Sequence, residues 1–234
     1  MRPLGVVLPV FDEGSIPADL VARMPEIVDR VYVVDDGSTD DGPNLAERAG
    51  ARVIRHGGRR GAGAAIRSGL FAARDDGMTA VVVMAGNGKD DPAEIPRVVA
   101  PLDSGYDYVQ GSRFLRGGSF QNLPRTRYLL IKAYTLAFRL LSGFAASDVT
   151  NGFRAYRVSL LADPRIKLDQ SWLDGYELEY YLHYKAVTRR YRVIEVPVSK
   201  NYTAGKRNYS KMRPVIDWWH GIRPMLFLAL RLRD

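Results

Sequence analysis

The chain begins with a regular alternation of short apolar runs and longer amphipathic stretches. Apolar runs of strand length predict strands at residues 5–10, 31–35, 51–55, 80–84 and 106–110. Between them, apolar positions at helical spacing predict helices at residues 17–29, 43–49, 62–75 and 92–102. Strands separated by helices are joined by right-handed crossovers, so the pattern predicts an α/β fold with a mainly parallel sheet flanked by helices.

The pattern changes after about residue 112. Helices are predicted at residues 124–142 and 175–186, a strand at 191–198, and an amphipathic helix at 214–233. We therefore expect a main domain over residues 1–200, followed by a basic loop and a C-terminal amphipathic helix over 201–234. The apolar stretch at 129–146 contains Lys132 and Arg139. A membrane-spanning helix needs about 20 mostly apolar residues, so we expect this helix to pack on the domain.

Composition and charge narrow the classes of partner that the protein is expected to bind. The 234 residues, 46% of them hydrophobic, are enough for a real core. The absence of cysteine excludes disulfides and thiolate chemistry, and fits a cytoplasmic protein, as does a first strand without a secretory signal before it. The net charge of +8 favours an anionic partner, namely nucleic acid, a membrane surface or a phosphorylated substrate. Basic and aromatic residues are not interleaved, so we do not expect nucleic-acid binding.

Residues 31–42, VYVVDDGSTDDG, place carboxylates directly after a predicted strand. Ligands of open α/β sheets bind outside the carboxyl ends of the strands, so Asp35 and Asp36 are candidate nucleotide ligands. Because neighbouring strand residues point to opposite sides, only one of the two is expected to face the ligand. Here the sequence resembles the family 2 glycosyltransferases of the GT-A fold, most closely their dolichyl-phosphate mannosyltransferase-like branch. The resemblance implies a GT-A, Rossmann-like sheet.

Further motifs carry the same resemblance. Residues 9–13, PVFDE, resemble a Pro-x-x-Asn-Glu loop with Asp12 in place of Asn, which implies nucleotide contacts for Pro9, Phe11 and Glu13. Residues 56–69, HGGRRGAGAAIRSG, resemble the basic glycine-rich loop that follows the third strand. Glycines allow a phosphate to approach the backbone, and a helix start offers amide donors. Gly61 and Arg67 are the candidates there, although the glycines can equally serve helix packing.

The diphosphate is expected to meet cations. Residues 110–113, QGSR, resemble a Gly-Ser-Arg segment, which makes Arg113 a candidate because guanidinium forms paired bonds to phosphate. Arg127 stands where the branch places another arginine, and Ser210-Lys211 resembles a basic loop over the phosphates. Residues 147–156, SDVTNGFRAY, resemble the acceptor-side motif, with Asn151 in place of the usual Ser.

The metal-binding motif is altered. Relatives carry Asp-x-Asp and then Gln, but here Ala85, Asn87 and Lys89 fall on these positions. Hard cations prefer carboxylate oxygens. Three outcomes remain open: Lys89 with the other cations neutralises the diphosphate without metal, Asn87, Asp90 and Asp91 hold a metal from shifted positions, or the site only binds.

An inverting transferase needs a base for the acceptor hydroxyl. Asp148 in the acceptor motif is the first candidate, and the others are Asp174, Glu177 and Glu179. Asp174 and Glu177 can share a helix face, whereas Glu177 and Glu179 cannot. The predicted catalytic residues are therefore Asp148, Glu177 and Lys89.

We interpret the chain as an enzyme acting on a nucleoside-diphosphate sugar, with a GDP-sugar preferred because of the branch that it resembles. The first interpretation is inverting glycosyl transfer. The second is a nucleotide-sugar mutase working without flavin, and the third is a non-catalytic nucleotide-sugar-binding protein. Neither flavin nor NAD is expected, and a divalent metal stays open. Peripheral membrane contact and a homo-oligomer formed through the C-terminal helix also stay open.

Overall fold

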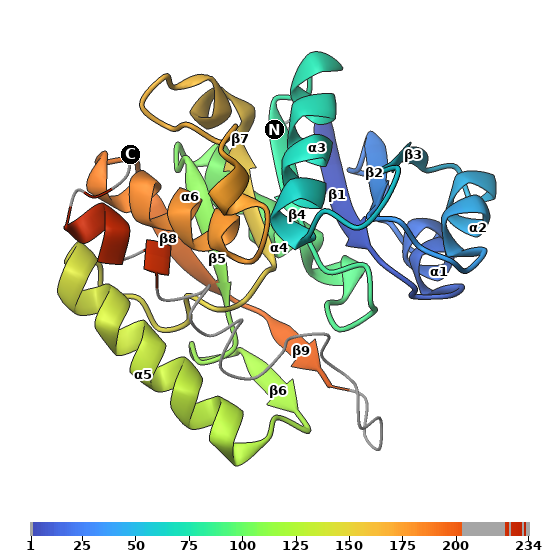
Figure 1. Cartoon of the computed structure of the whole chain (residues 1–234). Helices are drawn as coiled ribbons and strands as arrows, with labels where there is room; N and C mark the ends of the chain where they lie inside the picture. The colour runs from blue at the N-terminus through green and yellow to red at the C-terminus, as the bar shows by residue number, and fades with distance from the viewer. Residues whose placement is uncertain (1, 203–222, 225, 231, 233–234) are drawn as a thin grey trace.

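A seven-stranded sheet forms the centre of the computed structural model, which describes residues 2–202, 223–224, 226–230 and 232. The strand order is β3-β2-β1-β4-β7-β5-β8 (Figure 1). The strands are β1 (Leu4–Val10), β2 (Arg30–Asp35), β3 (Arg52–Arg55), β4 (Ala80–Val83), β5 (Tyr108–Ser112), β7 (Arg154–Arg157) and β8 (Val193–Pro197). All run parallel except β7, which is antiparallel to β4 and β5. The predicted α/β fold with a mainly parallel sheet is confirmed.

Helices cover both faces of the sheet. On one face lie α1 (Ile16–Ala22), α2 (Gly42–Arg48) and α4 (Ile95–Asp103), and on the other lie α3 (Ala62–Asp75) and α6 (Glu177–Thr188). The alternation along β1 divides the core: Val6 and Leu8 pack toward the first face and Val7 toward the second. Short 3-10 turns are η1 (Pro92–Glu94), η2 (Val158–Ala162) and η3 (Ser171–Leu173).

A smaller unit extends the sheet's β5–β8 side. It consists of α5 (Arg125–Ser142) and a parallel pair of short strands, β6 (Ser119–Gln121) and β9 (Ser199–Asn201) (Figure 1). Phe138 of α5 packs with Tyr184 of α6, Ala146 and Val149. Within the part of the chain that is described, neither α5 nor any other helix has the length and apolar character needed to cross a bilayer.

Several predicted boundaries were wrong. The helix expected at 17–29 ends at Ala22, because Pro25 restricts the preceding residue and has no amide to donate. The strand expected at 106–110 begins at Tyr108, and β6, β7 and β9 were not predicted. β9 crosses the boundary drawn at residue 200, and the division into two parts stays a prediction. Of the predicted helix at 214–233, residues 223–224 and 226–229 are helical, and most of the others lie outside the described residues.

Candidate active site

The loops that follow β1 and β2 are fixed to each other. Asp12 has a left-handed backbone with φ of 48°, a conformation that Asp and Asn tolerate. Its carboxylate accepts hydrogen bonds from the amide and hydroxyl of Thr39 at 2.7 and 3.2 Å, and its amide donates to the Ser38 hydroxyl at 3.0 Å. Asp35 accepts from the Ser38 amide at 2.8 Å. Because β1 and β2 pair in parallel, with Val10 opposite Asp35, these loops lie at one edge of the sheet.

Asp36 anchors the glycine-rich loop. It is 4% exposed and accepts from the amides of Arg60 and Gly61 at 2.9 and 2.8 Å, and His56 Nδ1 lies 2.9 Å from its Oδ1. Asp35 and Asp36 therefore hold different loops, and the expectation that only one of them faces a ligand stays a prediction. Phe11 directly follows β1, and the Arg59 guanidinium lies 4.3 Å from the centre of its ring. Two stacked planar groups of this kind give a flat surface suited to a nucleobase.

The start of α3 is covered by the protein itself. A Cβ on Gly63 would lie 2.1 Å from the Leu173 carbonyl oxygen, and the Ala64 amide donates to the Asp174 carbonyl at 3.0 Å. Arg67 is buried, and its Nη2 donates to the Asp174 carboxylate at 2.6 Å. Gly61 and Arg67 thus have packing roles at the turn around Asp174, in place of the open phosphate contacts that the sequence indicated.

The two carboxylates of the loop after β4 are engaged within the protein. Asp90 is 2% exposed; one carboxylate oxygen lies 2.7 Å from the Lys200 ammonium and the other accepts from the Ala85 amide at 3.1 Å. Asp91 instead caps η1 and forms an exposed ion pair with Arg23 at 2.8 Å. Asn87 Oδ1 is 3.4 Å from the Lys89 amide. Over the described residues, no three His, Cys, Asp or Glu side chains come together as a metal site. Asp90 and Asp91 are thus both paired with basic side chains, and a metal held by Asn87, Asp90 and Asp91 stays a prediction.

Cations converge where that metal was expected. Burial, and then the charges of Lys200 and Arg127, lower the pKa of Lys89 to about 8, while Glu13 and Asp90 oppose the shift. The Lys89 carbonyl also accepts from the Asn201 amide at 3.0 Å, which ties this loop to β9. Lys200 was missed by the sequence analysis, although its place two residues after the strand predicted at 191–198 could have identified it.

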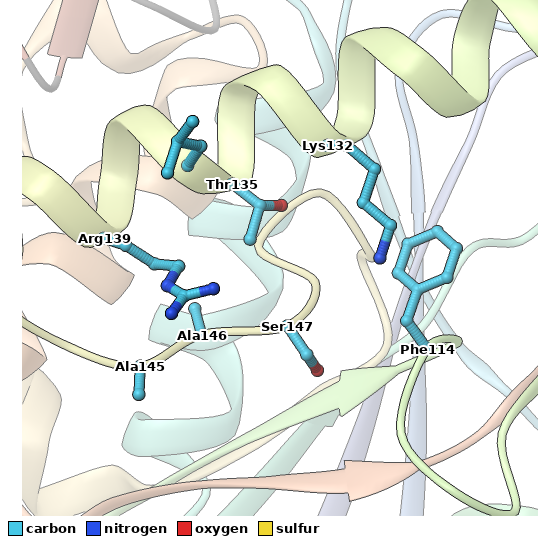
Figure 2. A pocket seen from close by; sticks show the side chains of 8 residues that line it. Phe114, Lys132, Thr135, Arg139, Ala145, Ala146 and Ser147 are labelled. Atoms are coloured by element: carbon cyan, nitrogen blue, oxygen red, sulfur yellow. The ribbon is translucent and has the colours of Figure 1, made fainter.

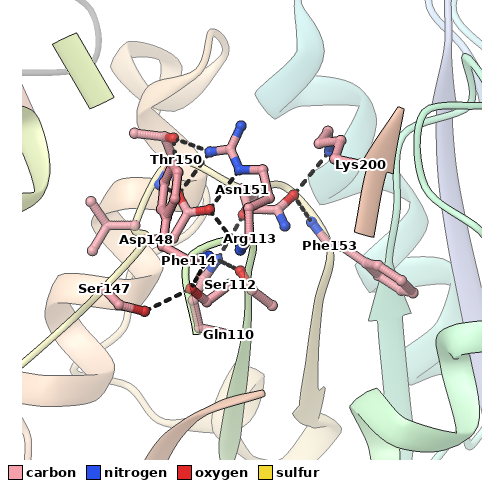
Figure 3. A network of polar contacts seen from close by, with 12 residues as sticks. Gln110, Ser112, Arg113, Phe114, Ser147, Asp148, Thr150, Asn151, Phe153 and Lys200 are labelled. Carbon is pink, nitrogen blue, oxygen red and sulfur yellow. Dashed lines mark hydrogen bonds and ion pairs between the residues drawn. The ribbon is translucent and has the colours of Figure 1, made fainter. Parts of the chain in front are cut away.

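Arg113 and Asp148 form a buried pair (Figure 3). Arg113 donates to the Asp148 carboxylate through Nε at 2.6 Å and through Nη2 at 2.8 Å, and the two side chains are 2% and 0% exposed. Arg113 also donates to the hydroxyls of Thr150, at 2.7 Å, and Tyr202. Burial opposes its charge, but Asp148 and Tyr202 hold the pKa of Arg113 above its ordinary value. Asp148 is buried and its carboxylate is paired with Arg113, which corrects its assignment as the base. The Arg113 guanidinium in turn makes its hydrogen bonds to Asp148, Thr150 and Tyr202, which are all protein groups.

The acceptor-side motif is held from two directions. Glu195 of β8 accepts from the amides of Ser147 and Asp148 at 2.7 and 2.9 Å. Asn151, at the position of the usual Ser, accepts from the Lys200 ammonium at 2.9 Å (Figure 3). The altered motif and the altered metal loop therefore share Lys200 as a common partner.

Of the remaining candidate residues, Arg127 lies beside Lys89 and Glu177 lies at the start of α6. The Arg127 guanidinium lies 5.4 Å from the Tyr202 ring, so Arg127, Tyr202 and Arg113 form a contiguous group beside Lys89. Glu177 is fully buried at the start of α6 and pairs with Arg223, which corrects its assignment as a base that meets an acceptor. Lys211 lies outside the described residues.

Comparison with known proteins identifies the family. The model described as "Glycosyl transferase family 2" matches residues 6–163. The chain belongs to this family. It is 32% identical over 217 residues to polyprenol monophosphomannose synthase of Mycolicibacterium smegmatis, covering 88% of this chain and 80% of the relative. It is 31% identical over 210 residues to dolichyl-phosphate hexose transferase of Haloferax volcanii, covering 87% and 85%.

Solved structures agree on the fold. Glucosyl-3-phosphoglycerate synthase from Mycobacterium tuberculosis, in complex with Mg2+ and uridine-diphosphate, superposes with a TM-score of 0.72 at 22% identity. The similarity covers 100% of this chain and 81% of that one. The GT-A fold and an enzyme of the glycosyltransferase class are thus established for the chain. None of the relatives named here is a mutase, so that interpretation gains no support.

Proposed function

We propose that this chain transfers a hexose from a nucleoside-diphosphate sugar, preferably a GDP-sugar, to a lipid phosphate with inversion. The names of two relatives support this acceptor, because one is a polyprenol monophosphomannose synthase and the other a dolichyl-phosphate hexose transferase. The observation that carries the proposal is the pair of cations Lys89 and Arg127 at the loop after β4, where Lys200 is held beside them by Asp90. These cations neutralise the diphosphate as it leaves the sugar, which is the task of a metal in other transferases.

The buried carboxylates suit a phosphate acceptor. A hydroxyl acceptor needs a base, but Asp148 and Glu177 are enclosed and paired with arginines. The second pKa of a phosphomonoester is about 6, so the phosphate oxygen that attacks is already ionised at neutral pH. In the proposed reaction this oxygen forms the bond to the anomeric carbon while the bond to the diphosphate breaks. No protein carboxylate has to accept a proton.

The proposal assigns the remaining residues by position. Phe11, with Arg59 against its ring, contacts the base, and Pro9, Glu13 and Asp35 lie at the same edge of the sheet. Asp36 acts by holding the glycine-rich loop in place. Work at a membrane surface follows from the lipid acceptor.

The test is transfer from radiolabelled GDP-mannose, and separately from UDP-glucose, to polyprenyl phosphate or to the corresponding free alcohol. We expect a glycolipid only with the phosphate, and equal rates with EDTA or with added manganese. Lys89→Ala should lower the rate at least about tenfold, as is typical for loss of one charge-stabilising group, and Lys89→Arg should retain more of it. Loss of activity in EDTA that manganese restores would overturn the role of the cations. An isomeric nucleotide sugar formed without acceptor would overturn the transferase.

A further inference from the structure

His56 is held between two side chains that belong to different elements. Its ring nitrogen Nδ1 lies 2.9 Å from Oδ1 of Asp36, which directly follows β2, and its Nε2 lies 3.0 Å from the Ser68 hydroxyl on α3. The His56 amide also donates to the Asp35 carbonyl at 2.9 Å. The His56 side chain is only 5% exposed. This residue therefore joins the ends of β2 and β3 to α3 at one buried point.

These contacts define which ring nitrogen of His56 carries the proton. A carboxylate only accepts hydrogen bonds, so Nδ1 donates to Asp36. In the neutral imidazole the other nitrogen is then an acceptor, and the Ser68 hydroxyl donates to it. The hydrogen bonds thus run in one direction, from Ser68 through His56 to Asp36. They fix both the tautomer and the orientation of the imidazole ring.

The same Asp36 carboxylate holds the loop that follows His56. It accepts from the amides of Arg60 and Gly61 at 2.9 and 2.8 Å. Residues 57–60 are exposed, so packing in the core does not fix them. Polar contacts at both ends of the loop hold it instead, with His56 at its start and the two amides at its end.

Arg59 lies in the middle of this loop and is supported by its neighbours. A Cβ on Gly37 would lie 2.9 Å from the Arg59 amide nitrogen, so the loop after β2 packs directly against the backbone at this point. The Arg59 guanidinium lies 4.3 Å from the centre of the Phe11 ring. The place of this guanidinium therefore depends on the backbone that His56 and Asp36 hold.

We propose that His56 is a positioning residue for the base of the sugar nucleotide. It holds the loop of residues 57–61 so that Arg59 is arranged against Phe11 before the base binds, which lowers the cost of ordering on binding. Ser68 acts through His56 by fixing its ring. This inference rests on the proposed function, in which the base contacts Phe11.

The experiment is a double-mutant cycle on the affinity of the full chain for GDP, measured by calorimetry. We expect Arg59→Ala to weaken binding about fivefold, which is typical of a cation–π contact at an exposed site, and His56→Ala to weaken it by a similar factor. In the Arg59→Ala background His56→Ala should have no further effect, because His56 acts through Arg59. His56→Asn should retain more affinity than His56→Ala, since its amide can still donate to Asp36. Ser68→Ala should weaken binding by less than His56→Ala.

Two further measurements separate positioning from a general loss of structure. In the transfer assay His56→Ala should raise the KM for the donor and leave kcat unchanged, as expected when only ground-state binding is lost. Arg139→Ala is the matched control, because it removes the same charge from the wall of the pocket between α5 and residues 145–147 (Figure 2). Its GDP affinity should equal that of wild type. Circular dichroism confirms that each variant is folded before its affinity is compared.

The outcomes distinguish this inference from the proposed function. Additive effects of His56→Ala and Arg59→Ala would overturn the inference, because His56 would then act independently of Arg59. Wild-type affinity in His56→Ala, together with weak binding in Arg59→Ala, would also overturn it while leaving the base site of the proposed function in place. Wild-type affinity in Arg59→Ala would remove that base site and the inference with it.

Discussion

At the residue scale, Lys89 links site geometry to pH. Burial and the neighbouring charges of Lys200 and Arg127 lower its pKa from 10.5 to about 8. We predict that affinity for GDP, measured by calorimetry, falls as pH rises through about 8, because the ammonium is lost there. Lys89→Arg should bind without this inflection, since guanidinium stays charged. A wild-type affinity that is constant across this range would contradict the role of Lys89.

The same shift affects stability. The unfolded chain retains the Lys89 proton up to about 10.5, whereas the folded protein releases it at about 8. Between these values the unfolded state binds more protons, so Lys89 makes the free energy of unfolding rise with pH in this window. The group therefore destabilises the fold at neutral pH, as expected of a residue retained for binding.

We predict that Asp148 stabilises the folded protein by pairing with the buried Arg113. Asp148→Asn leaves the buried charge of Arg113 without its counter-ion, and removing one partner of a buried pair costs about 3–5 kcal/mol. We expect a loss of this order in the free energy of unfolding, measured by urea denaturation. Asp41→Asn, which breaks the exposed pair with Arg48, is the matched control and should change stability by less than about 1 kcal/mol. A variant as stable as wild type but inactive would restore Asp148 as the base.

At the scale of elements, contact between α3 and the turn at residues 173–175 requires glycine. We predict that Gly63→Ala lowers the free energy of unfolding by about 1–3 kcal/mol, because the new methyl group would overlap the Leu173 carbonyl. Gly57→Ala, in the loop that precedes α3, is the control, since nothing lies within 4 Å of its Cβ position. Thermal denaturation of both variants measures the difference. Equal effects would show that the close approach is not what the glycine provides.

At the scale of the whole molecule, two functions are expected in two regions. The nucleotide is expected at the edge formed by the loops after β1 and β2, and the diphosphate beside Lys89 and Arg127. The Arg127 guanidinium lies against the Tyr202 ring, and the Tyr202 hydroxyl accepts a hydrogen bond from Arg113, so the diphosphate region includes the start of α5.

Structural features that depend on neighbouring residues in the sequence could be predicted. The alternation of strands and helices up to residue 112 identified the mainly parallel sheet. β7 was not predictable, because its sequence RAYR has an arginine at each end of a central strand. Arg154 is accommodated by the Tyr108 hydroxyl and by the Val149 carbonyl, at 3.0 and 3.1 Å. Tyr108 lies 46 residues from Arg154 in the sequence, so no local pattern reveals this partner.

The sequence by itself determined the family and the mainly parallel sheet, because these depend on residue types at fixed local spacing. The tertiary structure decided which charges meet. Lys200 reaches Asp90 across 110 residues, and Arg113 reaches Asp148 across 35. An ion's partner inside a protein depends on burial and distance, and both are defined only when the chain has folded.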